Sequence, residues 1–90
     1  MYAAKISESV VRYARFLGIY ARHTPLGRGF PEWMFVFEGR VMFIKFVRTG
    51  GELTEIQARA HENLAAHGVS VHVVDAPAKG RETVERFFRG

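Results

Sequence analysis

The segment from 40 to 74 most constrains the fold of this chain, because two apolar runs flank a stretch with helical spacing. The first run, RVMFIKFV at 40–47, is typical of a strand, and VSVHVV at 69–74 is a second. Between them, Thr54 and Gln57 form a capping box that opens a helix. Two strands joined through a helix in one sheet run parallel, with a right-handed crossover. The segment therefore predicts a strand–helix–strand unit.

The flanking segments extend this unit to the order helix, strand, strand, helix, strand, helix. The predicted elements are a helix over 5–17, an irregular Gly-, Pro- and Arg-rich loop over 21–31, a strand over 33–37, a Glu38-Gly39 hairpin turn, the strand over 40–47, the helix from Thr54, the strand over 69–74 and a last helix over 81–88. These elements predict one α/β domain over 1–90, in which helices flank a small mixed central sheet.

The amino-acid composition and the net charge restrict the class of protein to which this chain can belong. The 48% hydrophobic and 13% aromatic content indicates a packed core, and the absence of cysteine excludes disulfides and thiolate metal sites. No apolar run approaches the roughly 18 residues of a membrane span and no signal peptide opens the chain, so we expect a cytoplasmic protein. The formal charge of +4 favours an anionic partner, most often nucleic acid, although a domain can be basic without one.

Lys45 departs from the pattern around it. It stands in the middle of the 40–47 strand, whose two faces are otherwise largely apolar. An ammonium in such a place needs a carboxylate partner or a route by which its end reaches water at a sheet edge. The sequence leaves both alternatives open.

Three stretches of the chain point to a family. They are GRGFPEW at 27–33, FIKFVRTGGELTEIQARAHENL at 43–64 and HGVSVHVVD at 67–75, and the matching positions within them are Gly29, Pro31, Gly50, Gly51, Leu53, Gln57, Gly68 and Val71. From about Glu8 to Asp75 the chain resembles the virus-type replication-repair nuclease (VRR-NUC) domain, a branch of the PD-(D/E)xK nuclease superfamily. The resemblance implies a minimal restriction-endonuclease-like fold, a phage or prophage source, and a role in DNA replication, repair or recombination.

The resemblance also implies a chemistry and a set of site residues. In the family, two acids and a backbone carbonyl hold Mg²⁺ or Mn²⁺, and a lysine positions the attacking water. The first-helix acid of the family matches Glu8, and the aspartate of its Pro-Asp motif is Glu32 here. The glutamine of its helix matches Gln57. The glutamate of its Glu-x-Lys motif falls on Lys45, and the lysine of that motif falls on Val47.

These departures predict a changed site. We expect a Glu8–Lys45–Glu32 cluster in which the ammonium replaces the metal ion, so that hydrolysis is weak or absent. Glu8 and Glu32 then remain as the candidate acidic metal ligands. A migrated site, in which Lys45 takes the lysine role and Glu38 or another acid supplies a ligand, is the alternative. Glu8 is also explained by the dipole of the first helical turn, and Gln57 by the capping box.

The resemblance places a basic loop beside the cleft of the site. We expect phosphate contacts from Arg22, His23 and Arg28 in this loop, extended by Arg12 and Arg15 of the first helix. A solvated basic loop is the alternative. The four histidines His23, His61, His67 and His72 show no spacing typical of a zinc site.

The leading functional prediction is a DNA-binding, nuclease-like domain, weak or inactive in catalysis, that binds duplex or branched DNA. One alternative is an active, structure-specific nuclease that uses Mg²⁺ or Mn²⁺. Another is a phage protein that keeps the fold but binds a host protein. The hairpin from 33 to 47 is apolar on both faces, and this pattern together with the resemblance suggests a homodimer.

Overall fold

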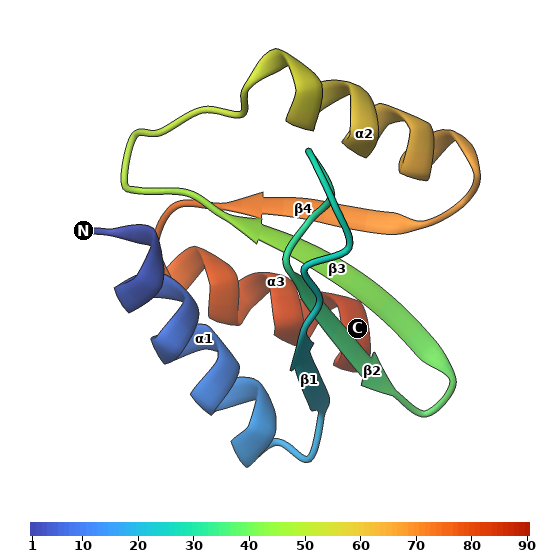
Figure 1. The fold of residues 1–90 in the computed structure, drawn as a ribbon. Coiled ribbons are helices and arrows are strands. Elements are labelled where there is room, and N and C mark those ends of the chain that lie inside the picture. Colours follow the sequence, from blue (N-terminus) through green and yellow to red (C-terminus); the bar gives the residue numbers. More distant parts are fainter.

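A four-stranded mixed sheet separates two layers of helices in the computed structural model, which describes all residues from 1 to 90 (Figure 1). Helices α1 and α3 lie on one face of the sheet, and α2 lies on the other. The elements in chain order are α1 (Ala3–Phe16), β1 (Tyr20–His23), β2 (Trp33–Phe37), β3 (Arg40–Phe46), α2 (Glu55–Ala66), β4 (Ser70–Val74) and α3 (Pro77–Arg89). None of the helices combines the length and the apolar composition that a membrane span requires.

The strands lie in the order β1-β2-β3-β4 across the sheet. The pairs β1–β2 and β2–β3 are antiparallel, and in the second pair Trp33 lies opposite Ile44. The pair β3–β4 is parallel, and the chain passes from one to the other through α2. The predicted strand–helix–strand unit and the α/β class are therefore confirmed. The capping box that opens α2 is confirmed as well, because Thr54 and Gln57 exchange both of its hydrogen bonds.

The hydrophobic core lies between the sheet and the α1–α3 layer. On β3, Met42 and Ile44 are fully buried, and Phe46 is nearly so, because alternate side chains of a strand point to the same face. Residues from the neighbouring elements complete the core, among them Ile6, Val10, Ala14, Phe35, Val74 and Val84. The opposite face of β3 carries Val41, Phe43 and Lys45, so the alternation puts Lys45 on the side of α2.

Three predictions of local structure are wrong. The segment predicted as an irregular loop over 21–31 begins as a strand, since Tyr20–His23 form β1. Three of these four residues are exposed, and an exposed edge strand leaves no apolar alternation in the sequence. The last helix begins at Pro77 rather than 81, because proline is well suited to a first helical position. Helix α1 also begins earlier, at Ala3, which puts Glu8 beyond its first turn.

Gly80 explains how α3 fits against α1. The backbone of Gly80 lies so close to α1 that a Cβ atom built on it would be 2.3 Å from Val10 Cγ2. A glycine inside a helix lowers stability by about 1 kcal/mol relative to alanine. At position 80 the close packing of α3 against α1 offsets this cost.

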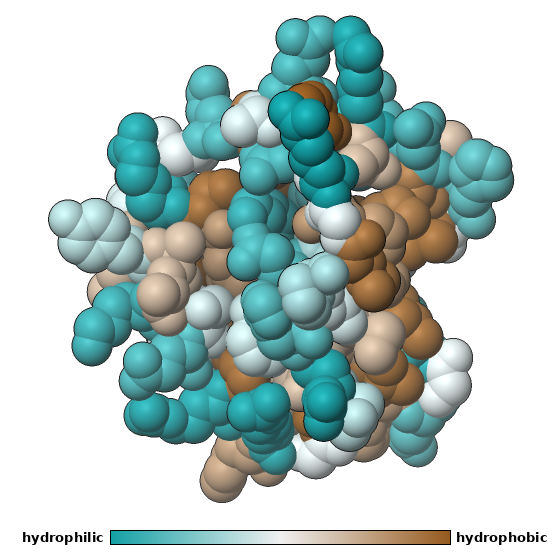
Figure 2. Space-filling view, in the orientation of Figure 1, coloured by the Kyte–Doolittle hydropathy of each residue, from teal (hydrophilic) through white to brown (hydrophobic).

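Helix α2 covers only part of its face of the sheet. Tyr20, Val36 and Val41 lie side by side across β1, β2 and β3 in the pairing register. Val41 is 42% exposed and Tyr20 is 57% exposed. In Figure 2, which has the orientation of Figure 1, hydrophobic residues gather on the right of the view, whereas hydrophilic residues dominate elsewhere.

Candidate functional site

Lys45 and Glu32 form an ion pair at the end of the β2–β3 hairpin that lies away from its turn. Glu32 directly precedes β2, and the register that pairs Trp33 with Ile44 continues to place Glu32 across from Lys45. Lys45 Nζ donates a hydrogen bond to Glu32 Oε1. The Lys45 side chain is 17% exposed and that of Glu32 is 40% exposed. The carboxylate thus reaches solvent while the ammonium is largely enclosed.

The ion pair lines a crevice of about 340 Å³ beside the start of α1. Besides Glu32 and Lys45, the crevice is lined by Ala3, Ala4, Ser7, His23, Trp33 and Phe46. His23 Nε2 lies 4.0 Å from Glu32 Oε2, and the His23 ring meets the Trp33 ring edge-on at 5.4 Å between centroids. Glu32 is therefore approached by two nitrogen-bearing side chains, one from β1 and one from β3.

Two buried polar side chains near this pair have no hydrogen-bond partner within the protein. They are His61 Nε2 on α2 and Thr24 Oγ1, which follows β1. The Thr24 amide donates to the Glu32 carbonyl oxygen at 2.6 Å, and His61 is only 8% exposed. Burial lowers the pKa of His61, and the positive charge of Lys45 lowers it further. Unpartnered buried polar groups are uncommon in folded proteins and are concentrated here at one place.

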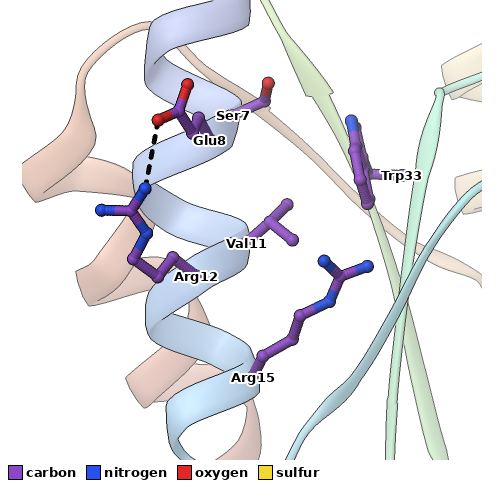
Figure 3. A pocket seen from close by; sticks show the side chains of 6 residues that line it. All are labelled: Ser7, Glu8, Val11, Arg12, Arg15 and Trp33. Carbon is purple, nitrogen blue, oxygen red and sulfur yellow. Dashed lines mark hydrogen bonds and ion pairs between the residues drawn. The ribbon is translucent and has the colours of Figure 1, made fainter.

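Glu8 lies apart from the pair. Figure 3 shows Glu8 and Arg12 joined to each other on α1, where both line a crevice that Trp33 borders on its other side. The distance from Arg12 Nη2 to Glu8 Oε1 is 3.2 Å, and both side chains are mostly exposed. The structure therefore unites Glu32 with Lys45 as predicted, but it gives Glu8 a different partner than the predicted three-residue cluster.

A second crevice of about 470 Å³ runs between α1 and β2 and shares Ser7 and Trp33 with the first. Arg15 extends from α1 toward the Trp33 ring across this crevice (Figure 3). Its guanidinium carbon is 5.9 Å from the ring centroid, and its Nη2 donates to the Ala21 carbonyl oxygen at 2.8 Å. A basic group is thus fixed beside Trp33, a residue that both crevices share.

The other predicted residues lie in three different places. Arg22 is exposed and its guanidinium lies 6.0 Å from the Tyr20 ring centroid, while Arg28 is exposed in the loop after β1. Gln57 is occupied by the capping box of α2. Glu38 lies in the hairpin turn at the opposite end of β3 from Lys45 and lines a separate crevice with Leu17 and Phe88.

The side chains around Lys45 do not fit a divalent metal ion. Glu32 is the one carboxylate that lines the crevice, and Lys45 already neutralises it. No group of three or more His, Cys, Asp or Glu side chains is placed to hold a metal ion. Val47, at the position that the resemblance gives to the family's lysine, is 8% exposed, and its amide donates to the Val74 carbonyl at 3.0 Å. An ammonium there would be buried.

Sequence reasoning missed His61 and Trp33 as residues of this site, whereas Thr24 belongs to the loop that it placed beside the cleft. One signal for His61 was present, because it follows Gln57 by four positions and precedes Leu64 by three, which places it on the sheet-facing side of α2. Trp33 carried no such signal, since its place depends on the pairing of β1 with β2.

Comparison of this chain with protein-family models, with curated proteins and with solved structures found no match.

Proposed function

We propose that this protein is a DNA-binding domain of nuclease-like architecture, related to the VRR-NUC type, in which Lys45 takes the place of the catalytic metal ion. The observation that carries this proposal is the Lys45–Glu32 ion pair. The acid and the lysine come from the positions that the resemblance assigns to metal ligands. An ammonium beside the carboxylate supplies a fixed positive charge where a nuclease would hold a divalent cation.

The basic groups around the pair support binding to the phosphate backbone. Arg12 and Arg15 flank the crevice between α1 and β2, and Arg22 and Arg28 belong to β1 and the loop that follows it. Contacts of this kind are made to phosphate oxygens and carry no base information. The proposed binding is therefore salt-dependent and has little sequence preference.

Weak or absent hydrolysis follows from the same arrangement. Hydrolysis of a phosphodiester in this superfamily needs a divalent ion, which polarises the phosphate and lowers the pKa of the attacking water. Glu32 is committed to Lys45, and Glu8 to Arg12. The chain's own residues then bind and orient the phosphate backbone but activate no water.

The experiment that tests this function is incubation of labelled linear and branched DNA with the protein, in Mn²⁺ and in EDTA. A Glu32→Ala variant purified in parallel controls for contaminating nuclease. We expect retarded DNA without cleavage in both conditions. Cleavage by the natural protein and not by the variant would show that a working active site is built around Lys45, and the proposal would be wrong.

Protein binding is a second candidate function, and the row of exposed Tyr20, half-buried Val36 and exposed Val41 favours it. This row widens the apolar surface beside α2, and a second copy of the chain is the proposed partner. Sedimentation analysis of the natural protein and of Val41→Lys tests it. A dimer that the substitution dissociates supports the candidate, whereas a monomeric natural protein excludes self-association.

A further inference from the structure

A basic pocket lies at the other end of β3 from the Lys45–Glu32 pair. It has a volume of about 200 Å³, several times the roughly 30 Å³ that one water molecule occupies. Its lining residues are Arg40, His72, Thr83, Arg86 and Phe87. Three of these five carry a nitrogen-bearing ring or guanidinium, and none is an acid. The pocket is therefore formed to attract negative charge.

Arg40 is held in position by Phe87. Its guanidinium carbon lies 4.3 Å from the centroid of the Phe87 ring, and its Nη1 donates a hydrogen bond to the Phe87 carbonyl oxygen. A guanidinium has five N–H donors, so most of them remain available to a ligand. Because the ring and the carbonyl fix the planar group, little conformational entropy is lost when an anion binds.

His72 and Arg86 add a ring N–H donor and a guanidinium from two other elements. His72 lies on β4 and meets the Phe87 ring edge-on at 6.5 Å between centroids. Arg86 lies on α3, where its Nη2 also donates to Glu82 Oε1. Thr83 donates its hydroxyl proton to the Lys79 carbonyl at 2.8 Å and forms part of the wall. The charged groups around His72 are thus Arg40 from β3, and Arg86 and its partner Glu82 from α3.

We propose that Arg40, His72 and Arg86 form a binding site for a phosphate monoester, such as the phosphate of a nucleoside monophosphate. Guanidinium groups match the oxygen geometry of phosphate, and a doubly charged oxyanion gains from three donors that converge from separate elements. The site is separate from the proposed DNA contact, because the two crevices share no lining residue. Arg40 lies at the opposite end of β3 from Lys45, and His72 pairs with Ile44, whose side chain lies on the other face of the sheet from Lys45.

His72 reports on occupancy of the site. Burial lowers the pKa of His72, and the charge of Arg86 lowers it further. A bound phosphate dianion reverses the local field, since it stabilises the imidazolium form that can donate from both ring nitrogens. Binding is therefore expected to raise the pKa of His72, which a merely structural histidine would not show.

The test is an NMR titration of the His72 ring signals with inorganic phosphate and with adenosine monophosphate, at constant ionic strength. Chloride and adenosine are the matched controls. We expect the two phosphates to shift the His72 signals and raise its pKa, and the controls to leave both unchanged. Absence of a shift at the highest phosphate concentration, or an equal shift with chloride, would overturn the proposal.

Two substitutions distinguish phosphate binding at this pocket from non-specific attraction by the positive charge of the protein. Arg40→Gln and Arg86→Gln are each expected to weaken phosphate binding roughly tenfold, because each removes a charge-assisted hydrogen bond. Arg86 is exposed, so its substitution leaves the fold intact. The Arg86→Gln result therefore stands even if Arg40→Gln disturbs the fold by removing the contact of Arg40 with Phe87. Arg59→Gln removes the same charge from α2 and is expected to have no effect. If Arg59→Gln weakens phosphate binding equally, the binding is non-specific electrostatic attraction and the proposal is wrong.

A final comparison identifies the source of the phosphate. Oligonucleotides that carry a 5′-phosphate or a 5′-hydroxyl are titrated against the complex with adenosine monophosphate. Displacement by the phosphorylated strand alone assigns the site to DNA ends, and displacement by neither assigns it to a free nucleotide. Equal displacement by both strands would contradict a site for phosphate monoesters, because internal phosphodiesters would then be sufficient.

Discussion

Lys45 and Glu32 form one ion pair but differ in their access to water: 17% of the lysine side chain is exposed, against 40% of the glutamate side chain. The ammonium end of this pair depends on its partner, whereas the carboxylate can be solvated if the pair is broken. Removing the carboxylate should therefore cost more stability than removing the ammonium, and single substitutions measure this difference.

Glu32→Gln is expected to destabilise the protein more than Lys45→Met. The first leaves a largely enclosed ammonium without a counter-ion and costs about 1–3 kcal/mol, whereas the second leaves a carboxylate that water can reach. The double variant should be more stable than Glu32→Gln alone, because removing both charges leaves neither uncompensated. Urea unfolding of the four proteins measures this cycle. A more damaging Lys45→Met would contradict the enclosure of Lys45.

The pH dependence of stability should reflect His61. Its pKa is lowered by burial and by Lys45, so the unfolded chain, with an ordinary histidine pKa of about 6.5, binds protons that the folded chain does not. The contribution of His61 to stability is therefore present above pH about 6.5 and is lost as the pH falls through the lower folded pKa. His72, whose pKa is also lowered, contributes with the same sign.

His61→Phe tests this assignment, because it removes the titration together with the unpartnered Nε2 atom. We expect stability near that of the natural protein at neutral pH and higher stability at acidic pH, measured by urea unfolding across the pH range. His67→Phe is the matched control, because it makes the same substitution at the exposed C-cap of the same helix. An unaltered profile in His61→Phe would exclude His61 as a source of the pH dependence.

Gly80→Ala is expected to destabilise the protein even though alanine is the better helix former. Alanine gains about 1 kcal/mol in helix propensity over glycine. Its Cβ atom would lie 2.3 Å from Val10 Cγ2, and this overpacking costs about 1–3 kcal/mol in addition to the loss of the close approach of the two helices. The cost is therefore larger than the gain. In a Val10→Ala background the same change should cost less, because the 2.3 Å contact is removed while Val74 Cγ1 at 3.0 Å and the Cβ of residue 10 at 3.3 Å remain close. Thermal unfolding of both pairs measures the difference, and equal effects in the two backgrounds would place the cause elsewhere.

Thr54→Ala and Gln57→Ala distinguish a capping role from a role in the site. Thr54 and Gln57 exchange both hydrogen bonds of the capping box, so each substitution should cost about 1 kcal/mol of stability. Neither should change DNA affinity. If Gln57→Ala lowers DNA affinity while Thr54→Ala does not, Gln57 belongs to the binding surface after all.

The fold was predictable from sequence where side chains repeat with a clear period. Strand β2 was predicted at its observed bounds, and the capping box located α2, because both signals are local. Strand β1 was missed because only Ala21 is buried in it. Helix α3 was predicted four residues short at its start, since the glycine that reads as a helix breaker at position 80 is in fact a packing contact with Val10.

The candidate site was predictable in part for a similar reason. The pairing of Lys45 with Glu32 was expected from the family resemblance, which assigned both residues to one site, and the observed hairpin register brings them together. The separation of Glu8 did not, because it depends on where α1 begins and on the competing contact with Arg12 one turn later. His61 and Thr24 enter the site through tertiary packing between the sheet, α2 and the loop after β1, which no short motif encodes.

The most direct test of the central claim, that Lys45 makes the metal ion unnecessary for DNA binding, is the salt dependence of affinity for a short duplex, measured by fluorescence anisotropy in EDTA and in Mn²⁺. We predict equal affinity in the two conditions and a linear fall of log K with log salt concentration. Arg28→Gln should reduce that slope by about 0.9, the value of one phosphate contact, whereas Arg59→Gln should not. Binding that requires Mn²⁺, or no binding at low salt, would contradict the account.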